Sequence, residues 1–388
     1  MIYHGYKISK FVIALGFYFL VVILGVVDLL GIGSILKYIA LIPFLCCISK
    51  INRMGLDSSW KNVKMYYYFA ILSILWTVDY ELTIDAVIAF ASFFLLISCM
   101  STQIYNKGEI HFLKKMLVWS SRISLVCTWL FATFSEGRLI IREAIMKEDP
   151  NYLCAYFFFG IAFCVQSFLV NEKKLRKIIC IGELLLYLFT IFCTGSRGGL
   201  FGGIVVAAIV FIKTTNIKSI SAFISRFSLV GVLFLLIPLI ASLVNPDVMV
   251  RFSGEAISES DGSGRYEIWE DAIKAFESYD FFSFLFGKGI NASRTVAFLY
   301  HFQRVNVMHN VFLENLIGLG IIGVSLYLMQ LWTIYKKSKI DVFCMSIFIG
   351  TIILSLSTSI LFLKPVWNIQ LMIACVCYSN MYKNTKYT

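Results

Sequence analysis

The segment HNVFLENLIGLGIIGVSLYLMQLWTI, residues 309–334, is apolar over nearly its whole length. A bilayer core about 30 Å thick needs roughly 20 apolar residues per helix, so this segment is long enough to cross a membrane. The composition of the whole chain agrees: 59% of its residues are hydrophobic, its mean hydropathy is +0.81 and only 15% are charged. A soluble domain carries about 25% charged residues. The sequence therefore predicts an all-α integral membrane protein.

Twelve stretches have the length and hydropathy of membrane spans, and we expect them to form a single polytopic domain over residues 1–388. These stretches are residues 11–30, 32–49, 65–79, 83–102, 113–134, 151–170, 177–194, 198–213, 220–244, 309–334, 341–362 and 365–382.

The distribution of charge along the chain predicts its orientation. Lysine and arginine near helix ends resist translocation and mark the cytoplasmic side of a membrane protein. Both termini and alternate connections carry most of the basic residues, whereas the other connections carry most of the acids. We therefore expect both termini in the cytoplasm and the longest connection, residues 245–308, outside. The net charge of +11 is then mainly a topology signal and does not indicate nucleic-acid binding.

The cysteines and histidines indicate neither a disulfide framework nor a metal site. All eleven cysteines fall inside or at the edge of apolar stretches, and none lies in the long external connection. The four histidines are scattered, without the spacing of metal ligands. We therefore expect a protein that needs no metal and no cofactor.

The external connection contains a predicted amphipathic helix. Trp269, Ala272, Ile273 and Phe276 recur at helical spacing, and such a helix could lie along the outer leaflet of the membrane. The apolar run at residues 281–286 extends this surface, and Gly287-Lys288-Gly289 ends it.

The pentapeptide Gly195-Ser196-Arg197-Gly198-Gly199 lies where one apolar stretch ends and the next begins. Small residues let the backbone approach a ligand, and the free N–H groups at a helix start favour an anion. An arginine adds a planar group that can hold a phosphate through two hydrogen bonds. Taken alone this pattern is weak, because glycine is common in membrane helices and an interfacial arginine often only extends to water.

Three further residues have both a structural and a functional interpretation. Arg265 opens the amphipathic helix, where it could simply pair with nearby acids. His309 begins an apolar helix, where a lone histidine is more often structural, yet a neutral imidazole can accept a proton near pH 7. Arg122 lies near the middle of its apolar stretch, and an arginine there either serves a function or forms a buried ion pair with an acid such as Glu183.

Taken in order, these motifs resemble the signature of the O-antigen polymerase and O-antigen ligase superfamily over roughly residues 149–325. The matching elements are GSRGG at 195–199, SGR at 263–265 with Trp269 four residues on, HN at 309–310, and then Gly320 and Gly323. One departure is that residues 281–289 lack the proline that often precedes the Gly-x-Gly turn of this family.

The resemblance implies a metal-independent, inverting glycosyltransferase of the membrane-embedded GT-C type in the bacterial plasma membrane. Its substrates would be sugars carried by undecaprenyl pyrophosphate. Transfer breaks a bond between an anomeric carbon and pyrophosphate, so Arg265 and Arg197 would stabilise the departing charge. His309 would act as general base on the acceptor hydroxyl. Residues expected to bind substrate are Ser196, Gly198, Arg251, Tyr266, Trp269, Arg304 and Asn310.

Several functions stay open at this level. A polymerase would join lipid-linked repeat units into capsular, O-antigen or exopolysaccharide, and we favour it. A ligase would move finished glycan to lipid A core or to protein. A polysaccharide flippase or other transporter would show internal repeats and interrupted helices, and no repeat is visible. A non-catalytic scaffold would tolerate loss of His309. Expected partners are the lipid-linked donor and acceptor, the bilayer, a flippase and a chain-length regulator, but no nucleic acid.

Overall fold

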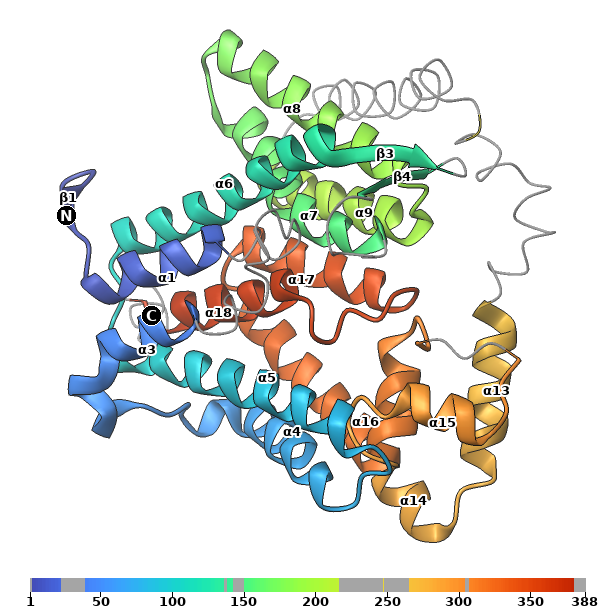
Figure 1. Ribbon diagram of the computed structural model, residues 1–388. Coiled ribbons are helices and arrows are strands. Elements are labelled where there is room, and N and C mark those ends of the chain that lie inside the picture. The colour runs from blue at the N-terminus through green and yellow to red at the C-terminus, as the bar shows by residue number, and fades with distance from the viewer. Residues whose placement is uncertain are drawn as a thin grey trace.

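The computed structural model describes residues 2–21, 39–135, 138–141, 150–215, 247, 265–303 and 307–379. Within these ranges fourteen α-helices form a bundle, in which many of the long helices run in the same general direction (Figure 1). They are α1 (Lys10–Val21), α3 (Leu41–Cys47), α4 (Lys61–Leu72), α5 (Tyr80–Cys99), α6 (Lys107–Phe131), α7 (Pro150–Val170), α8 (Lys174–Cys193), α9 (Arg197–Thr214), α13 (Arg265–Glu277), α14 (Phe281–Phe286), α15 (Ser293–Leu299), α16 (Val311–Ser338), α17 (Val342–Ser355) and α18 (Lys364–Cys377).

Shorter elements connect or flank these helices. The 3-10 helices are η2 (Ile48–Arg53), η3 (Ser58–Trp60), η4 (Ser73–Leu75) and η5 (Met100–Thr102). Two antiparallel hairpins pair β1 (Ile2–Tyr3) with β2 (Tyr6–Lys7) and β3 (Ala132–Ser135) with β4 (Arg138–Ile141).

The predicted all-α membrane architecture is confirmed. Eleven of the twelve predicted stretches overlap a helix, and the twelfth, residues 220–244, lies outside the described residues. Four of the described helices are long and apolar enough to cross a membrane; their spans are Tyr80–Thr102, Asn151–Val170, Arg197–Thr214 and Val311–Ser338. The two small hairpins are an addition that hydropathy did not predict.

Glycines set the spacing between α9, α7 and α17 at the centre of the bundle. A methyl group added at Gly202 would lie 2.7 Å from the Phe158 ring and 3.1 Å from the carbonyl oxygen of Gly350. A methyl group added at Gly350 would lie 2.4 Å from Val206. Small residues at such contacts let helix backbones approach closely, and the resulting van der Waals packing is one of the forces that associate helices within a membrane.

Arg122 on α6 forms an ion pair with Glu183 on α8, as the simpler of the two hypotheses predicted. Its Nε and Nη2 donate to the two carboxylate oxygens at 2.8 and 2.9 Å, and Tyr187 Oη donates to Glu183 Oε1 at 3.2 Å. Both side chains are mostly buried, at 31% and 14% exposure. An arginine at this depth is stabilised by the two-point contact with its partner.

The two ends of the bundle hold different parts of the chain. The backbone of Ser9 donates to Glu109 at the start of α6, and the backbone of Tyr105 donates to Tyr378 after α18. The start of the described chain and its last helix therefore meet at one end. Helices α13 to α15 and the β3–β4 hairpin lie at the other end (Figure 1). That the first end faces the cytoplasm stays a prediction.

Replacing Arg122 with methionine should destabilise the protein, because the Glu183 carboxylate would lose its cation while buried. Removing one member of a buried pair costs about 3–5 kcal/mol, whereas replacing both with apolar residues is often neutral. Thermal unfolding in detergent should therefore show a lower midpoint for Arg122→Met and substantial recovery in Arg122→Met/Glu183→Leu. Equal midpoints for the single and double variants would contradict this account.

Candidate active site

The GSRGG pentapeptide forms the start of α9 and packs tightly. Ser196 is the N-cap, and its hydroxyl accepts a hydrogen bond from the backbone of Gly199 at 3.0 Å. Arg197 is the first residue of the helix and is half-buried. A methyl group added at Gly199 would lie 2.3 Å from Cys154 Sγ on α7. Packing thus accounts for Gly199, while the helix start presents Arg197 at the predicted external end of the bundle.

The turn after α17 brings the pentapeptide close to the HN motif. A methyl group added at Gly198 would lie 2.1 Å from the hydroxyl of Ser357. The residue before Ser357 is Leu356, and its carbonyl oxygen accepts a hydrogen bond from the side-chain amide of Asn310 at 3.2 Å. Two motifs more than a hundred residues apart therefore contact consecutive residues of one turn.

Asn310 also fixes the start of α16. Its Oδ1 accepts hydrogen bonds from the backbones of Phe312 and Leu313 at 2.9 and 3.2 Å, so the side chain caps the helix. His309 precedes this cap with φ of 48°, a left-handed conformation that costs energy in a residue other than glycine. The contacts of the Asn310 side chain position the backbone next to His309, and its binding of substrate stays a prediction.

The third motif reaches the same place through Trp269. Its indole Nε1 donates to the carbonyl oxygen of Met308 at 2.8 Å, directly before His309. Arg265 lies one turn earlier, as the first residue of α13, and is half-buried. Tyr266 is 57% exposed, and its ring contacts the Trp269 ring edge-on at 5.7 Å. The helix that carries Arg265 is therefore tied to the residue preceding the candidate base.

The amphipathic helix is confirmed as α13, but its apolar face differs from the predicted one. Ile273 is 47% exposed, and the buried positions are Ile268, Ala272, Ala275 and Phe276. This face packs in one cluster with residues of α15 and with Met308. The helix therefore buries these residues against protein, and its position along the outer leaflet stays a prediction.

The Gly287-Lys288-Gly289 turn docks on α16. The backbones of Lys288 and Gly289 donate to the carbonyl oxygens of Ile317 and Gly318 at 3.1 and 2.8 Å. Two residues later α16 is interrupted at Gly320, with φ of 66°. Both glycines of the turn also have positive φ, 75° and 105°, a conformation that glycine adopts without penalty. The turn forms without the proline that the family often has before it.

A comparison with protein families identifies this part of the chain. Residues 183–328 match the family model described as O-antigen ligase. The chain is similar to this family over these residues, which we call the O-antigen ligase domain. The domain runs from α8 into α16 and contains Arg197, Arg265 and His309. The resemblance seen in the sequence is thereby confirmed, and members of this family are membrane glycosyltransferase-like enzymes. A search of curated proteins finds no match to the chain.

Two of the predicted substrate-binding residues, Arg251 and Arg304, lie outside the described residues. The other candidates of the O-antigen ligase domain lie mainly at the starts of two helices, and both helix starts contact the turn after α17. Ser196, Arg197 and Gly198 stand at the start of α9, and His309 with Asn310 stands at the start of α16. Trp269 connects the start of α13 to the second of these helix starts.

The structure adds two residues that the sequence analysis did not single out. Arg138 on β4 donates from Nε to the carbonyl oxygen of Thr194 at 2.9 Å, directly before the pentapeptide. Glu314 lies in the first turn of α16, four residues after Asn310. Glu314 is the one acid of the apolar stretch 309–334, and a charge in such a stretch was a signal available from the sequence.

Replacing Gly198 with alanine tests the contact between the pentapeptide and the turn. The new methyl group would press on Ser357, and overpacking of this kind costs about 2 kcal/mol. The thermal midpoint should fall in Gly198→Ala and recover in Gly198→Ala/Ser357→Ala, which removes the hydroxyl. If removal of the hydroxyl gave no recovery, Gly198 and Ser357 would not be in contact.

Proposed function

We propose that this protein is a glycosyltransferase that polymerises undecaprenyl-pyrophosphate-linked oligosaccharide repeat units into capsular, O-antigen or exopolysaccharide. The observation that carries the proposal is the joining of three motifs of the O-antigen ligase domain. Asn310 and Gly198 contact adjacent residues of one turn, and Trp269 holds the backbone beside His309. The bacterial plasma membrane is the proposed location, with this end of the bundle outside.

The two arginines would stabilise the leaving pyrophosphate. Arg197 and Arg265 are the first residues of α9 and α13, which have 18 and 13 residues. The start of a helix carries partial positive charge, so each guanidinium would add to a field that already favours an anion. Arginine can also bind phosphate through two parallel hydrogen bonds. These groups would carry the electrostatic role that a divalent cation has in other transferases, so we propose a metal-independent reaction.

His309 would remove the proton from the attacking sugar hydroxyl. Its backbone is held on both sides, by the hydrogen bond to Met308 and by the helix cap at Asn310. A base that is already held in position loses less entropy when it reaches the reactive geometry, which lowers the barrier. Attack on the anomeric carbon from the side opposite pyrophosphate would invert its configuration. The exposed ring of Tyr266, beside Trp269, offers a face on which a sugar could stack.

A ligase is the second candidate, because the matching family model is described as O-antigen ligase. Both reactions use the same donor, so the arginines and the histidine would serve either one. The acceptor separates them: a polymerase extends glycan on the lipid carrier, whereas a ligase transfers it to lipid A core or to protein. A flippase and a chain-length regulator are further proposed partners.

Replacing His309 with alanine should reduce glycan product by about a hundredfold or more, the range contributed by a positioned general base. Lipid-linked product from purified protein and repeat units is the quantity to measure. His301→Ala is a matched control, since His301 also has positive φ, at 53°, but is exposed. Full activity in His309→Ala, with the protein present at normal level in the membrane, would remove His309 as the base.

Replacing Arg265 with lysine keeps the charge but removes the planar pair of donors. Turnover should fall at least about tenfold, because a single ammonium cannot reproduce a two-point contact with phosphate. Arg176→Lys, at an exposed position of α8 away from the motifs, serves as the control. A rate for Arg265→Lys equal to that of the control would reduce Arg265 to a surface charge.

A further inference from the structure

A second site lies at the opposite end of the bundle from the candidate active site. It is a cavity of about 770 Å³ lined by residues of η2, η3, η5 and the ends of α16 and α18. Helix α16 begins beside His309 and ends beside Lys337, which lines the cavity. With a rise of about 1.5 Å per residue, the path along α16 from one site to the other is roughly 40 Å, with the break at Gly320 between them. The cavity therefore belongs to a different surface of the protein.

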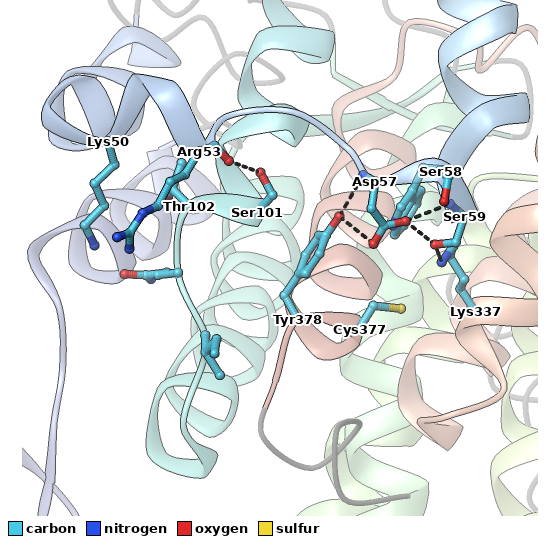
Figure 2. A pocket seen from close by; sticks show the side chains of 13 residues that line it. Lys50, Arg53, Asp57, Ser58, Ser59, Ser101, Thr102, Lys337, Cys377 and Tyr378 are labelled. Carbon is cyan, nitrogen blue, oxygen red and sulfur yellow. Dashed lines mark hydrogen bonds between the residues drawn. The ribbon is translucent and has the colours of Figure 1, made fainter. Parts of the chain in front are cut away.

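Cations stand on two sides of this cavity. Figure 2 shows Lys50 and Arg53 on one side and Lys337 on the other. Neither Lys50 nor Arg53 forms an ion pair with any residue that the structure describes. Lys337 donates from Nζ to the hydroxyl of Ser59 at 2.6 Å and lies 4.5 Å from the centre of the Trp60 ring. The charges face a solvent-accessible space in which an anion would be attracted.

Among the described residues that line the cavity, the one acid is Asp57, and its carboxylate is already hydrogen-bonded within the protein. The Asp57 carboxylate accepts hydrogen bonds from the Ser59 backbone at 2.8 Å, from the Ser59 hydroxyl, and from Tyr378 Oη at 3.4 Å (Figure 2). Burial acts to raise the pKa of Asp57, but these hydrogen bonds and the charge of Lys337 outweigh it and lower the pKa. With three cations against one such acid, the lining keeps a positive charge.

Two buried donors in the lining have no acceptor within the part of the chain that the structure describes. Trp60 has no exposed surface, and neither its indole Nε1 nor the amide Nε2 of Gln103 has a hydrogen-bond partner among the described residues. Buried polar groups are almost always hydrogen-bonded in folded proteins. Donors left without a partner beside a positively charged cavity indicate a ligand with several acceptor oxygens.

The surface around the cavity indicates that this ligand comes from the membrane. Ile48, Ile51 and Ile104 are 52%, 55% and 49% exposed. The first two stand on η2, and Ile104 lines the cavity two residues after η5. Apolar side chains exposed beside cations are the pattern of a lipid–water boundary. Basic pockets between membrane helices on the cytoplasmic side bind anionic lipid headgroups.

We propose that this cavity binds the phosphate of an anionic phospholipid headgroup. Lys50 and Arg53 contact the phosphate, Trp60 and Gln103 donate to its oxygens or to the glycerol oxygens, and the acyl chains run along Ile48, Ile51 and Ile104. A free phosphate compound would satisfy the same donors, so the test must separate the two sources. The inference does not depend on the reaction proposed for the other end.

Native mass spectrometry of the purified full-length protein with added phosphatidylglycerol or phosphatidylcholine measures this binding. Phosphatidylglycerol should bind more tightly than phosphatidylcholine. Lys50→Gln/Arg53→Gln should weaken it roughly 30-fold, on the basis of the attraction that each surface cation contributes. Lys173→Gln/Arg176→Gln removes the same charge from an exposed site on the same predicted side and should leave the affinity unchanged. Gln103→Met, which removes only the amide, should weaken it by a smaller factor.

Each outcome decides the question once thermal unfolding without lipid shows that the variants fold. Loss of phosphatidylglycerol in Lys50→Gln/Arg53→Gln alone, with no displacement by inorganic phosphate, supports the proposal. Displacement of the lipid by inorganic phosphate would overturn the lipid assignment and show that the cavity binds a soluble phosphate compound. Equal affinities in the two double variants, whether both reduced or both unchanged, would show that the cavity is not the binding site.

Discussion

The turn that follows α17 holds the candidate active site together. The carbonyl of Leu356 accepts a hydrogen bond from Asn310, and the next residue, Ser357, packs on Gly198. Helix α17 is itself set against α9 by the close approach of Gly350 and Gly202. Because the turn is rigidly connected to this packed centre, it fixes the start of α9 and the start of α16 relative to each other. The chemistry proposed for the protein depends on that fixed relation.

Much of the fold could be predicted from the sequence because a bilayer restricts the choices. A span must be helical and apolar, so hydropathy located the helices. A charge at membrane depth needs a partner, so Arg122 and Glu183 could be paired in advance. The amphipathic pattern likewise predicted α13. The pattern wrongly placed Ile273 on the buried face. Which residues of a helix become buried depends on the elements that pack against it, and these are distant in sequence.

Other features could not be predicted because their causes lie far away in the chain. The break of α16 at Gly320 depends on a turn about thirty residues earlier, whose backbone N–H groups donate hydrogen bonds to the carbonyl oxygens of Ile317 and Gly318. Arg138 reaches the pentapeptide only through a hairpin that hydropathy did not indicate. The sequence nominated Arg197, Arg265 and His309 as one site, and contacts of Gly198, Trp269 and Asn310 join the motifs that carry them.

An experimental structure with undecaprenyl pyrophosphate bound tests the central claim most directly. The account predicts density for the pyrophosphate within hydrogen-bonding reach of both guanidinium groups, Arg197 and Arg265, with the His309 imidazole facing the space where an acceptor sugar would enter. Pyrophosphate density away from the start of α9, or an imidazole directed into the lipid, would contradict it.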